Sequence, residues 1–169
     1  MPTASATTKR TLEVLAFLWA LPVTLVGFMA VLLCGGWVWS FQFKWQGRLA
    51  LVMGPRWMWM FPKWVAAVTL GAVILVRDRA DVEGGQQNPS VLLLHELEHV
   101  RQCCILGPFM LVLYPMASFL AWLLYRKLYR GNWFEMMARI QTDQARLKAI
   151  ALTDFLEPAR IPERGSLDR

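Results

Sequence analysis

Histidine and cysteine are scarce in this chain of 169 residues, which contains two histidines and three cysteines. An odd number of cysteines, two of them adjacent at Cys103 and Cys104, is a poor basis for a disulfide framework. Basic residues form neither a concentrated patch nor a recognisable binding motif, so nucleic acid is not the expected partner. The sequence also lacks internal repeats and low-complexity tracts. Its chemistry must therefore come from a few residues of one domain.

Apolar residues, by contrast, are abundant. Hydrophobic residues make up 56% of the chain, nine residues are tryptophan and the mean hydropathy is +0.37. These values exceed those of an ordinary soluble domain. The net charge is +6, and the basic residues flank apolar runs, as expected beside anionic lipid headgroups. We therefore expect the protein to have a membrane as a partner.

A long apolar run at residues 12–34 predicts a transmembrane helix, preceded by a flexible tail at residues 1–11. About 20 apolar residues suffice to cross a bilayer, and this run is too long for a cleaved signal peptide. We expect this helix to lie in the inner or plasma membrane. Basic residues are slightly more numerous after the run than before it, which favours a metal domain on the cytoplasmic side. The unpaired cysteines agree with a reducing compartment.

Both histidines lie in one motif, His95-Glu96-Leu97-Glu98-His99, which is the HExxH arrangement of zinc metallohydrolases. Positions four apart on a helix share one face, so the two imidazoles can hold one metal ion. Glu96 would lie beside the ion and act as general base on a water molecule. A surface helix could carry such a run without metal. Because it follows the apolar residues 91–94, where unpartnered imidazoles are costly, we predict a metal site with Zn²⁺ as cofactor.

Catalytic zinc commonly has three protein ligands, so two imidazoles leave one to be found. With no further histidine, the candidates are carboxylates and the thiolate of Cys103. Glu135 is a candidate in a helix expected from Asn132 through Lys148 or beyond. The spacing of Asn132 and Glu135 also fits a capping interaction, in which the glutamate caps the start of its own helix. Both interpretations of Glu135 are open on this evidence.

Two motifs, His95-Glu96-x-x-His99 and Glu135-x-x-Ala138, make residues 65–150 resemble the gluzincin metallopeptidases. The similarity is to the small minigluzincin core and to membrane-anchored heat-shock and CAAX-processing proteases. It implies an α+β, mostly helical, zincin-like domain at residues 35–156, with a short sheet, the HExxH helix and a downstream helix that supplies a glutamate. A flexible tail would follow at residues 157–169. One position departs from the pattern, since Arg139 stands where many relatives carry Asp.

The resemblance also implies the chemistry. His95, His99 and Glu135 would hold zinc, and Glu96 would be catalytic in the hydrolysis of a polypeptide substrate. The substrate would pair with the edge of a strand, and Tyr114, Tyr125 and Tyr129 are candidate oxyanion donors. Two alternatives remain. The chain could be a non-catalytic, membrane-anchored interaction protein on a zincin-like scaffold. It could also be an intramembrane protease, which the charges around the motif disfavour.

Further elements follow from patterns of apolar and turn residues. Strands are expected at residues 49–53 and, as one continuous strand, at 68–76, followed by a polar loop at 77–87. Asn88-Pro89-Ser90 predicts the start of the motif helix, and Gly107-Pro108 predicts its end after Leu106.

The apolar run at residues 109–125 poses a topological question. If it crossed the bilayer once, His99 and Glu135 would lie about 30 Å apart, on opposite sides. We therefore predict a buried or membrane-edge helix that packs against the motif helix.

Overall fold

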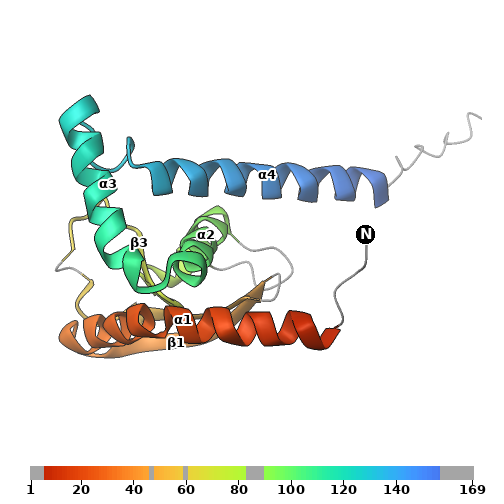
Figure 1. Cartoon of the computed structure of the whole chain (residues 1–169), viewed down its shortest axis with the longest axis horizontal. Coiled ribbons are helices and arrows are strands. Elements are labelled where there is room, and N and C mark those ends of the chain that lie inside the picture. Colours follow the sequence, from red (N-terminus) through yellow and green to blue (C-terminus); the bar gives the residue numbers. More distant parts are fainter. Residues whose placement is uncertain (1–5, 46–47, 59–60, 83–89, 157–169) are drawn as a thin grey trace, which may run out of the picture.

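The computed structural model describes residues 6–45, 48–58, 61–82 and 90–156. The chain is α+β and mostly helical, as predicted (Figure 1). Its elements, in chain order, are α1 (Ala6–Leu33), β1 (Trp37–Trp45), β2 (Arg48–Pro55), β3 (Ala67–Leu70), β4 (Val73–Val76), the 3₁₀ turn η2 (Arg79–Val82), α2 (Val91–Leu106), the 3₁₀ turn η3 (Gly107–Phe109), α3 (Met110–Tyr125) and α4 (Trp133–Leu156).

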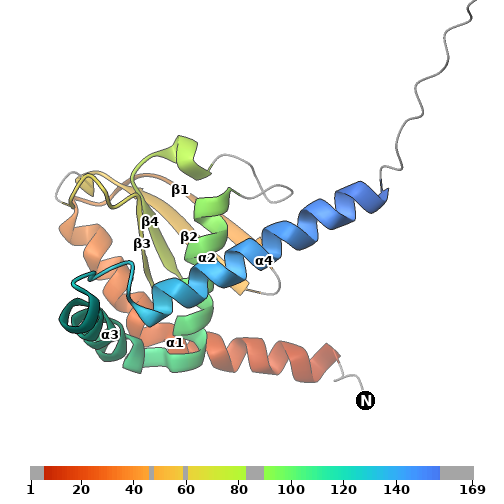
Figure 2. The ribbon, with the colours of Figure 1, turned by 90° about the horizontal axis from the view of Figure 1, so that it is seen from above.

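The four strands form one mixed sheet in the order β1-β2-β4-β3. β2 and β4 are parallel, while the outer pairs, β1 with β2 and β3 with β4, are antiparallel. All four residues of β4 are buried because both faces of the sheet are covered. Ile74 and Val76 pack with residues of α2, whereas Val73 and Leu75 pack with Val31 of α1. The sheet therefore lies between α1 and α2, with β3 at its edge (Figure 2).

The prediction of one strand at residues 68–76 is wrong, because the segment is a hairpin of β3 and β4. The strands are joined by Gly71 and Ala72, and Gly71 has a φ of +65°. Glycine at the first of two loop residues is the preference of a type II′ turn. The turn lies against α1, where the Thr24 hydroxyl accepts a hydrogen bond from the Ala72 N–H at 3.0 Å. This contact is local evidence that α1 belongs to the folded core.

α1 begins at Ala6, so the predicted tail at residues 1–11 is wrong from that residue onward, and residues 1–5 lie outside the described part. One face of the helix, including Ala20, Val23 and Val31, is buried against the sheet, α2 and α3. Trp19 donates an indole N–H hydrogen bond to the Ile105 carbonyl at 3.2 Å. The rest of the helix surface exposes large apolar side chains. α1 is thus both a core element and an apolar outer surface.

Among the described residues, two helical segments are long and apolar enough to cross a membrane, by length and composition: Thr11–Leu33 and Val91–Tyr125. In the apolar 18-residue stretch of each segment, 28% of the first and 17% of the second is buried inside the protein, whereas a core helix of a soluble domain is mostly buried. The second segment comprises α2, η3 and α3, and it turns sharply at Gly107, whose φ is +55° (Figure 1).

α3 decides between the two positions predicted for the apolar run at 109–125, buried or at the membrane edge. Of its residues only Met110 and Ala121 are buried, which excludes the buried position. Its outward side chains, such as Val112, Leu123 and Leu124, are exposed, and a membrane-edge position stays a prediction.

Other boundaries agree with the sequence. β2 contains the strand predicted at 49–53, and α2 ends at Leu106. The Ser90 hydroxyl caps α2 by accepting a hydrogen bond from the Leu93 N–H at 3.2 Å. η2 lies inside the predicted loop at 77–87. Residues 83–89, with Asn88 and Pro89, and the predicted tail at 157–169 lie outside the described residues.

Candidate metal centre

α2 and α4 bring both histidines of the motif to one glutamate. His95 and His99, one turn apart on α2, direct their Nε2 atoms at the carboxylate of Glu135 in the first turn of α4. The Nε2–Oε distances are 3.2 Å from His95 and 3.1 Å from His99. One ligand atom from each residue lies within 4.8 Å of the others. The three residues are close enough to hold one metal ion, as predicted.

The donor set is of a kind that holds zinc, since catalytic zinc sites combine two imidazoles with one carboxylate. His95 Nε2 lies 3.2 Å from Glu135 Oε2 and His99 Nε2 lies 3.1 Å from Glu135 Oε1, so both imidazoles reach the carboxylate. Glu135 is 2% exposed, and a buried carboxylate needs charged or hydrogen-bonding partners. Two imidazoles and a carboxylate also accept other divalent ions, so the ligands do not identify the metal.

Glu135 does not cap its own helix. The cap of α4 is Asn132, whose side-chain oxygen accepts a hydrogen bond from the Phe134 N–H at 2.8 Å. The Asn132 amide group donates to the Ser118 hydroxyl at 2.7 Å, which joins the start of α4 to α3. The Glu135 carboxylate instead contacts the histidines and accepts a hydrogen bond from the Tyr114 hydroxyl at 2.6 Å. The capping interpretation of Glu135 is therefore wrong.

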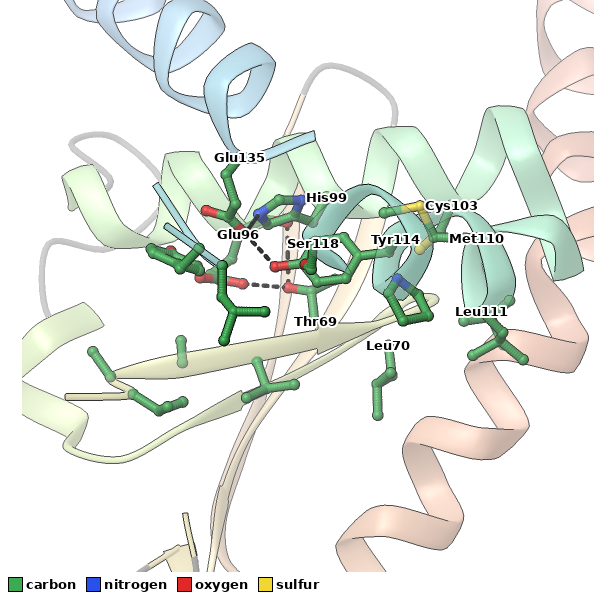
Figure 3. Close-up of a pocket in the computed structure, with 18 of the residues that line it drawn as sticks. Thr69, Leu70, Glu96, His99, Cys103, Met110, Leu111, Tyr114, Ser118 and Glu135 are labelled. Atoms are coloured by element: carbon green, nitrogen blue, oxygen red, sulfur yellow. Dashed lines mark hydrogen bonds and ion pairs between the residues drawn. The ribbon is translucent and has the colours of Figure 1, made fainter. Parts of the chain in front are cut away.

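Glu96 lies between the motif helix and the sheet edge. Its carboxylate accepts a hydrogen bond from the Thr69 hydroxyl of β3 at 2.6 Å, and the residue is 5% exposed. Figure 3 shows Glu96, Thr69, His99 and Glu135 directed toward one another. The hydrogen bond fixes the position of the Glu96 carboxylate next to the histidine pair.

The buried charges perturb one another. Burial raises the pKa of Glu96 and outweighs the opposing attraction of the histidines. Burial alone would lower the pKa of His99, but contacts with the Glu135 and Glu96 carboxylates raise it. For Glu135, burial acts upward, yet hydrogen bonds from His95 and His99 hold the pKa well below its usual range. Glu135 is thus ionised in the cluster.

The sequence named two further kinds of candidate. Cys103 is buried on α2 but is not part of the three-residue cluster, and burial raises its thiol pKa to about 11. The Cys103 alternative is not supported, because the cluster of possible ligand atoms among the described residues does not include its thiol. Of the candidate oxyanion donors, Tyr114 and Tyr129 line the cavity at the site, whereas Tyr125 is 64% exposed.

A cavity of about 520 Å³ opens beside the cluster. Glu96, His99 and Glu135 form its polar wall, and β3 forms one side (Figure 3). The remaining walls are mostly apolar and come from α1, α2, α3 and the segments before β3 and α4; they include Val23, Trp64, Met110, Leu111, Pro115 and Leu128. The cavity therefore has one polar end at the cluster and largely apolar walls elsewhere.

Two polar residues of the site were missed by sequence reasoning as functional groups: Thr69 and Gln102. Gln102 accepts a hydrogen bond from His99 Nδ1 at 2.9 Å. Its position three residues after His99 placed it on the histidine face of the helix, which was the available signal. Thr69 carried no such signal, because its contact with Glu96 joins elements far apart in the sequence.

Comparisons with protein-family models, with curated proteins and with solved structures find no match to this chain, so its resemblance to gluzincins rests on the residues described above.

Proposed function

We propose that this protein is a membrane-anchored zinc metallopeptidase. The observation that carries the proposal is the convergence of His95, His99 and Glu135 beside a buried Glu96, on a cavity bordered by an edge strand. A bound zinc ion would polarise the scissile carbonyl and lower the pKa of its water to about 7. Glu96 then accepts the proton of the attacking water and passes it to the leaving amine.

β3 supports a polypeptide as the substrate. It pairs with β4 along one edge only, and its other edge borders the cavity. An extended peptide can add to such an edge through main-chain hydrogen bonds, which position the scissile bond without selecting its sequence. The apolar walls at Leu70, Met110 and Leu111 would accept the side chains of an apolar segment. We place the anchor in α1, which has 28 residues, whereas α3, the other helix with a largely exposed apolar surface, has 16.

Metal content tests the ligand set. We expect about one zinc per chain in the detergent-purified protein, and its loss in both His95→Ala and Glu135→Ala. Zinc retained in Glu135→Ala would remove Glu135 from the ligands. Zinc absent from the folded wild-type protein would argue for the non-catalytic scaffold.

A conservative change of the base tests the reaction. Glu96→Gln keeps the shape of the side chain but cannot accept a proton, so we expect bound zinc with peptide hydrolysis reduced by about 10²-fold or more. Glu98→Gln is the matched control, because Glu98 belongs to the same helix but pairs with Arg101 at 2.6 Å. Cleavage of a broad peptide library would be followed by mass spectrometry. Equal cleavage by Glu96→Gln and the control, or none by zinc-loaded wild type, would refute the proposed activity.

A further inference from the structure

Gln102 is a buried side chain that contacts both helices of the metal centre. Its oxygen accepts a hydrogen bond from His99 Nδ1 at 2.9 Å, and its amide nitrogen donates to the Phe134 carbonyl at 3.0 Å. The residue is 7% exposed. Because a carbonyl oxygen can only accept, the second contact fixes which end of the amide faces His99. The amide oxygen therefore meets a protonated Nδ1.

This orientation has a consequence for the metal ligand. A neutral imidazole with its proton on Nδ1 presents the lone pair of Nε2, and His99 Nε2 is the atom that faces Glu135. The same glutamine is tied to Phe134, the residue immediately before Glu135. The Gln102 side chain thus orients the ring of His99 on α2 and is bonded to the first turn of α4, which carries Glu135.

Arg139 does not orient the histidines. It stands where many gluzincin relatives carry Asp, and its guanidinium lies 4.0 Å from Glu135 Oε2 with 40% of the side chain exposed. A cation cannot accept a hydrogen bond from an imidazole N–H. Among the described residues, Gln102 is the side chain within hydrogen-bonding distance of His99 Nδ1.

We propose that Gln102 is the positioning residue of the metal centre, holding His99 and the first turn of α4 in one geometry through a neutral amide. The inference rests on the proposed metal site but not on catalysis. Partners that orient a ligating histidine commonly contribute 10–100-fold to metal affinity. An amide also leaves the charge of the site unchanged, whereas a carboxylate would add a further negative charge beside Glu135 and Glu96.

The test compares metal binding by three variants with that of the wild-type protein. Gln102→Leu removes both hydrogen bonds, and Gln102→Glu restores an acceptor for His99 but cannot donate to Phe134 when ionised. Val100→Ala is the matched control, since Val100 is buried on the same helix against the sheet. Zn²⁺ affinity would be measured by competition with a chelator. The visible spectrum of the Co²⁺-loaded protein would report the ligand geometry.

We expect Gln102→Leu to bind Zn²⁺ 10–100-fold more weakly with an altered Co²⁺ spectrum. Gln102→Glu should recover part of the affinity, and Val100→Ala should lower thermal stability without changing the spectrum. Wild-type affinity and spectrum in both Gln102 variants would overturn the inference while leaving the metal site intact. If Gln102→Leu does not fold, a wild-type spectrum and affinity in Gln102→Glu alone would overturn the tie to Phe134. A wild-type protein that binds neither ion would instead refute the metal site itself.

Discussion

Glu135 is the residue that the other polar side chains of the metal centre contact. Its carboxylate is 2% exposed and lies within 3.2 Å of His95, His99 and Tyr114 side-chain atoms. An unpartnered carboxylate at this depth would cost several kcal/mol, so these contacts are required for its burial. Protonated His99 can occupy the network in the absence of metal. Proton and metal therefore compete for the same nitrogen atom.

This competition predicts a pH-dependent effect of zinc. The pKa of His99 is raised above its ordinary 6.5, so its contact with Glu135 stabilises the metal-free protein fully below pH 6.5 and is lost as the pH rises through the raised value. The pKa of Glu135 is lowered from 4.5, so its contribution is present above pH 4.5 and is lost as the pH falls through the lowered value. Zinc must displace the His99 proton, and its affinity should rise about tenfold per pH unit below the raised pKa.

Thermal unfolding in detergent, with and without zinc, measures this dependence. We expect the zinc-induced increase in unfolding temperature to be larger at pH 8 than at pH 6. Glu135→Ala serves as the control and should show no zinc-induced increase at either pH. An increase of the same size at both pH values in the wild type would mean that His99 is not protonated in the metal-free state.

Residues whose role follows from local spacing were predictable, and those defined by tertiary contact were not. His95, Glu96 and His99 are set by helical periodicity, and their motif identified them. Glu135 required the resemblance, because its helix also offered a capping explanation. Thr69 is a single threonine in an apolar strand, and only the packing of β3 against α2 gives it a partner.

Gly71 offers a prediction on stability. A Cβ at this position would meet the backbone of Thr24 and would also require a φ of +65°, so Gly71→Ala should lower the free energy of unfolding by about 3 kcal/mol. Gly36 has a φ of +81°, but a Cβ there would have no atom within 4 Å, and Gly36→Ala should cost only about 1 kcal/mol. Denaturant titration in detergent would compare the two. Equal losses of unfolding free energy in the two variants would show that contact with α1 does not restrict the side chain at position 71.

At the scale of elements, the two covered faces of the sheet explain the main error of prediction. A strand covered on both sides reads as a continuous apolar run, so residues 68–76 showed no alternation that would have separated β3 from β4. Gly71, inside that run, was the signal for a break. β1 was overlooked although Trp39, Phe41 and Phe43 alternate with more exposed residues, a pattern typical of a half-buried strand. The helix α2 was predictable because Ser90 and Gly107-Pro108 mark its ends.

The start of α4 carries the element-scale prediction. Asn132→Ala removes the cap of α4 and its hydrogen bond to Ser118, and we expect a loss of about 2 kcal/mol together with weaker zinc binding. The weaker binding follows because Glu135 lies in the first turn that this cap orders. Ser118→Ala keeps the cap and should cost about 1 kcal/mol with little change in zinc affinity. Unfolding and chelator competition would be measured on both variants. Full zinc affinity in Asn132→Ala would show that Glu135 is positioned without the cap.

At the scale of the whole molecule, α1 is both the proposed membrane anchor and a part of the cavity beside the metal centre. Its inner face supplies Val23 to the cavity wall and Thr24 to the turn between β3 and β4. Its outer face exposes Leu25 and Met29 at 55% and 56%, both in the second half of the apolar segment Thr11–Leu33. The proposed anchor and the proposed catalytic domain are thus packed as one body. They are not joined by a flexible linker.

Charges on the outer face test the anchor. Leu25→Arg with Met29→Arg should prevent stable membrane association, since an arginine at the centre of a span costs about 2.5–3.5 kcal/mol and Leu25 lies close to that centre. Both side chains point away from the core, so the recovered protein should still bind zinc. Ile140→Arg with Leu147→Arg places the same charges on exposed positions of α4 and should leave the protein in the membrane. Resistance to alkaline extraction would be compared. Equal retention of the two double variants would assign the anchor to another segment.

The contact between Thr24 and the Ala72 N–H also bears on biosynthesis. α1 precedes the strands in the chain, and the strands that need it as a cover for one face of the sheet are made later. Until they reach α1, Val73 and Leu75 lack the contact with Val31, and the cavity lacks the wall that Val23 supplies. A chain in which α1 has not packed on the sheet would therefore carry the motif beside an incomplete cavity.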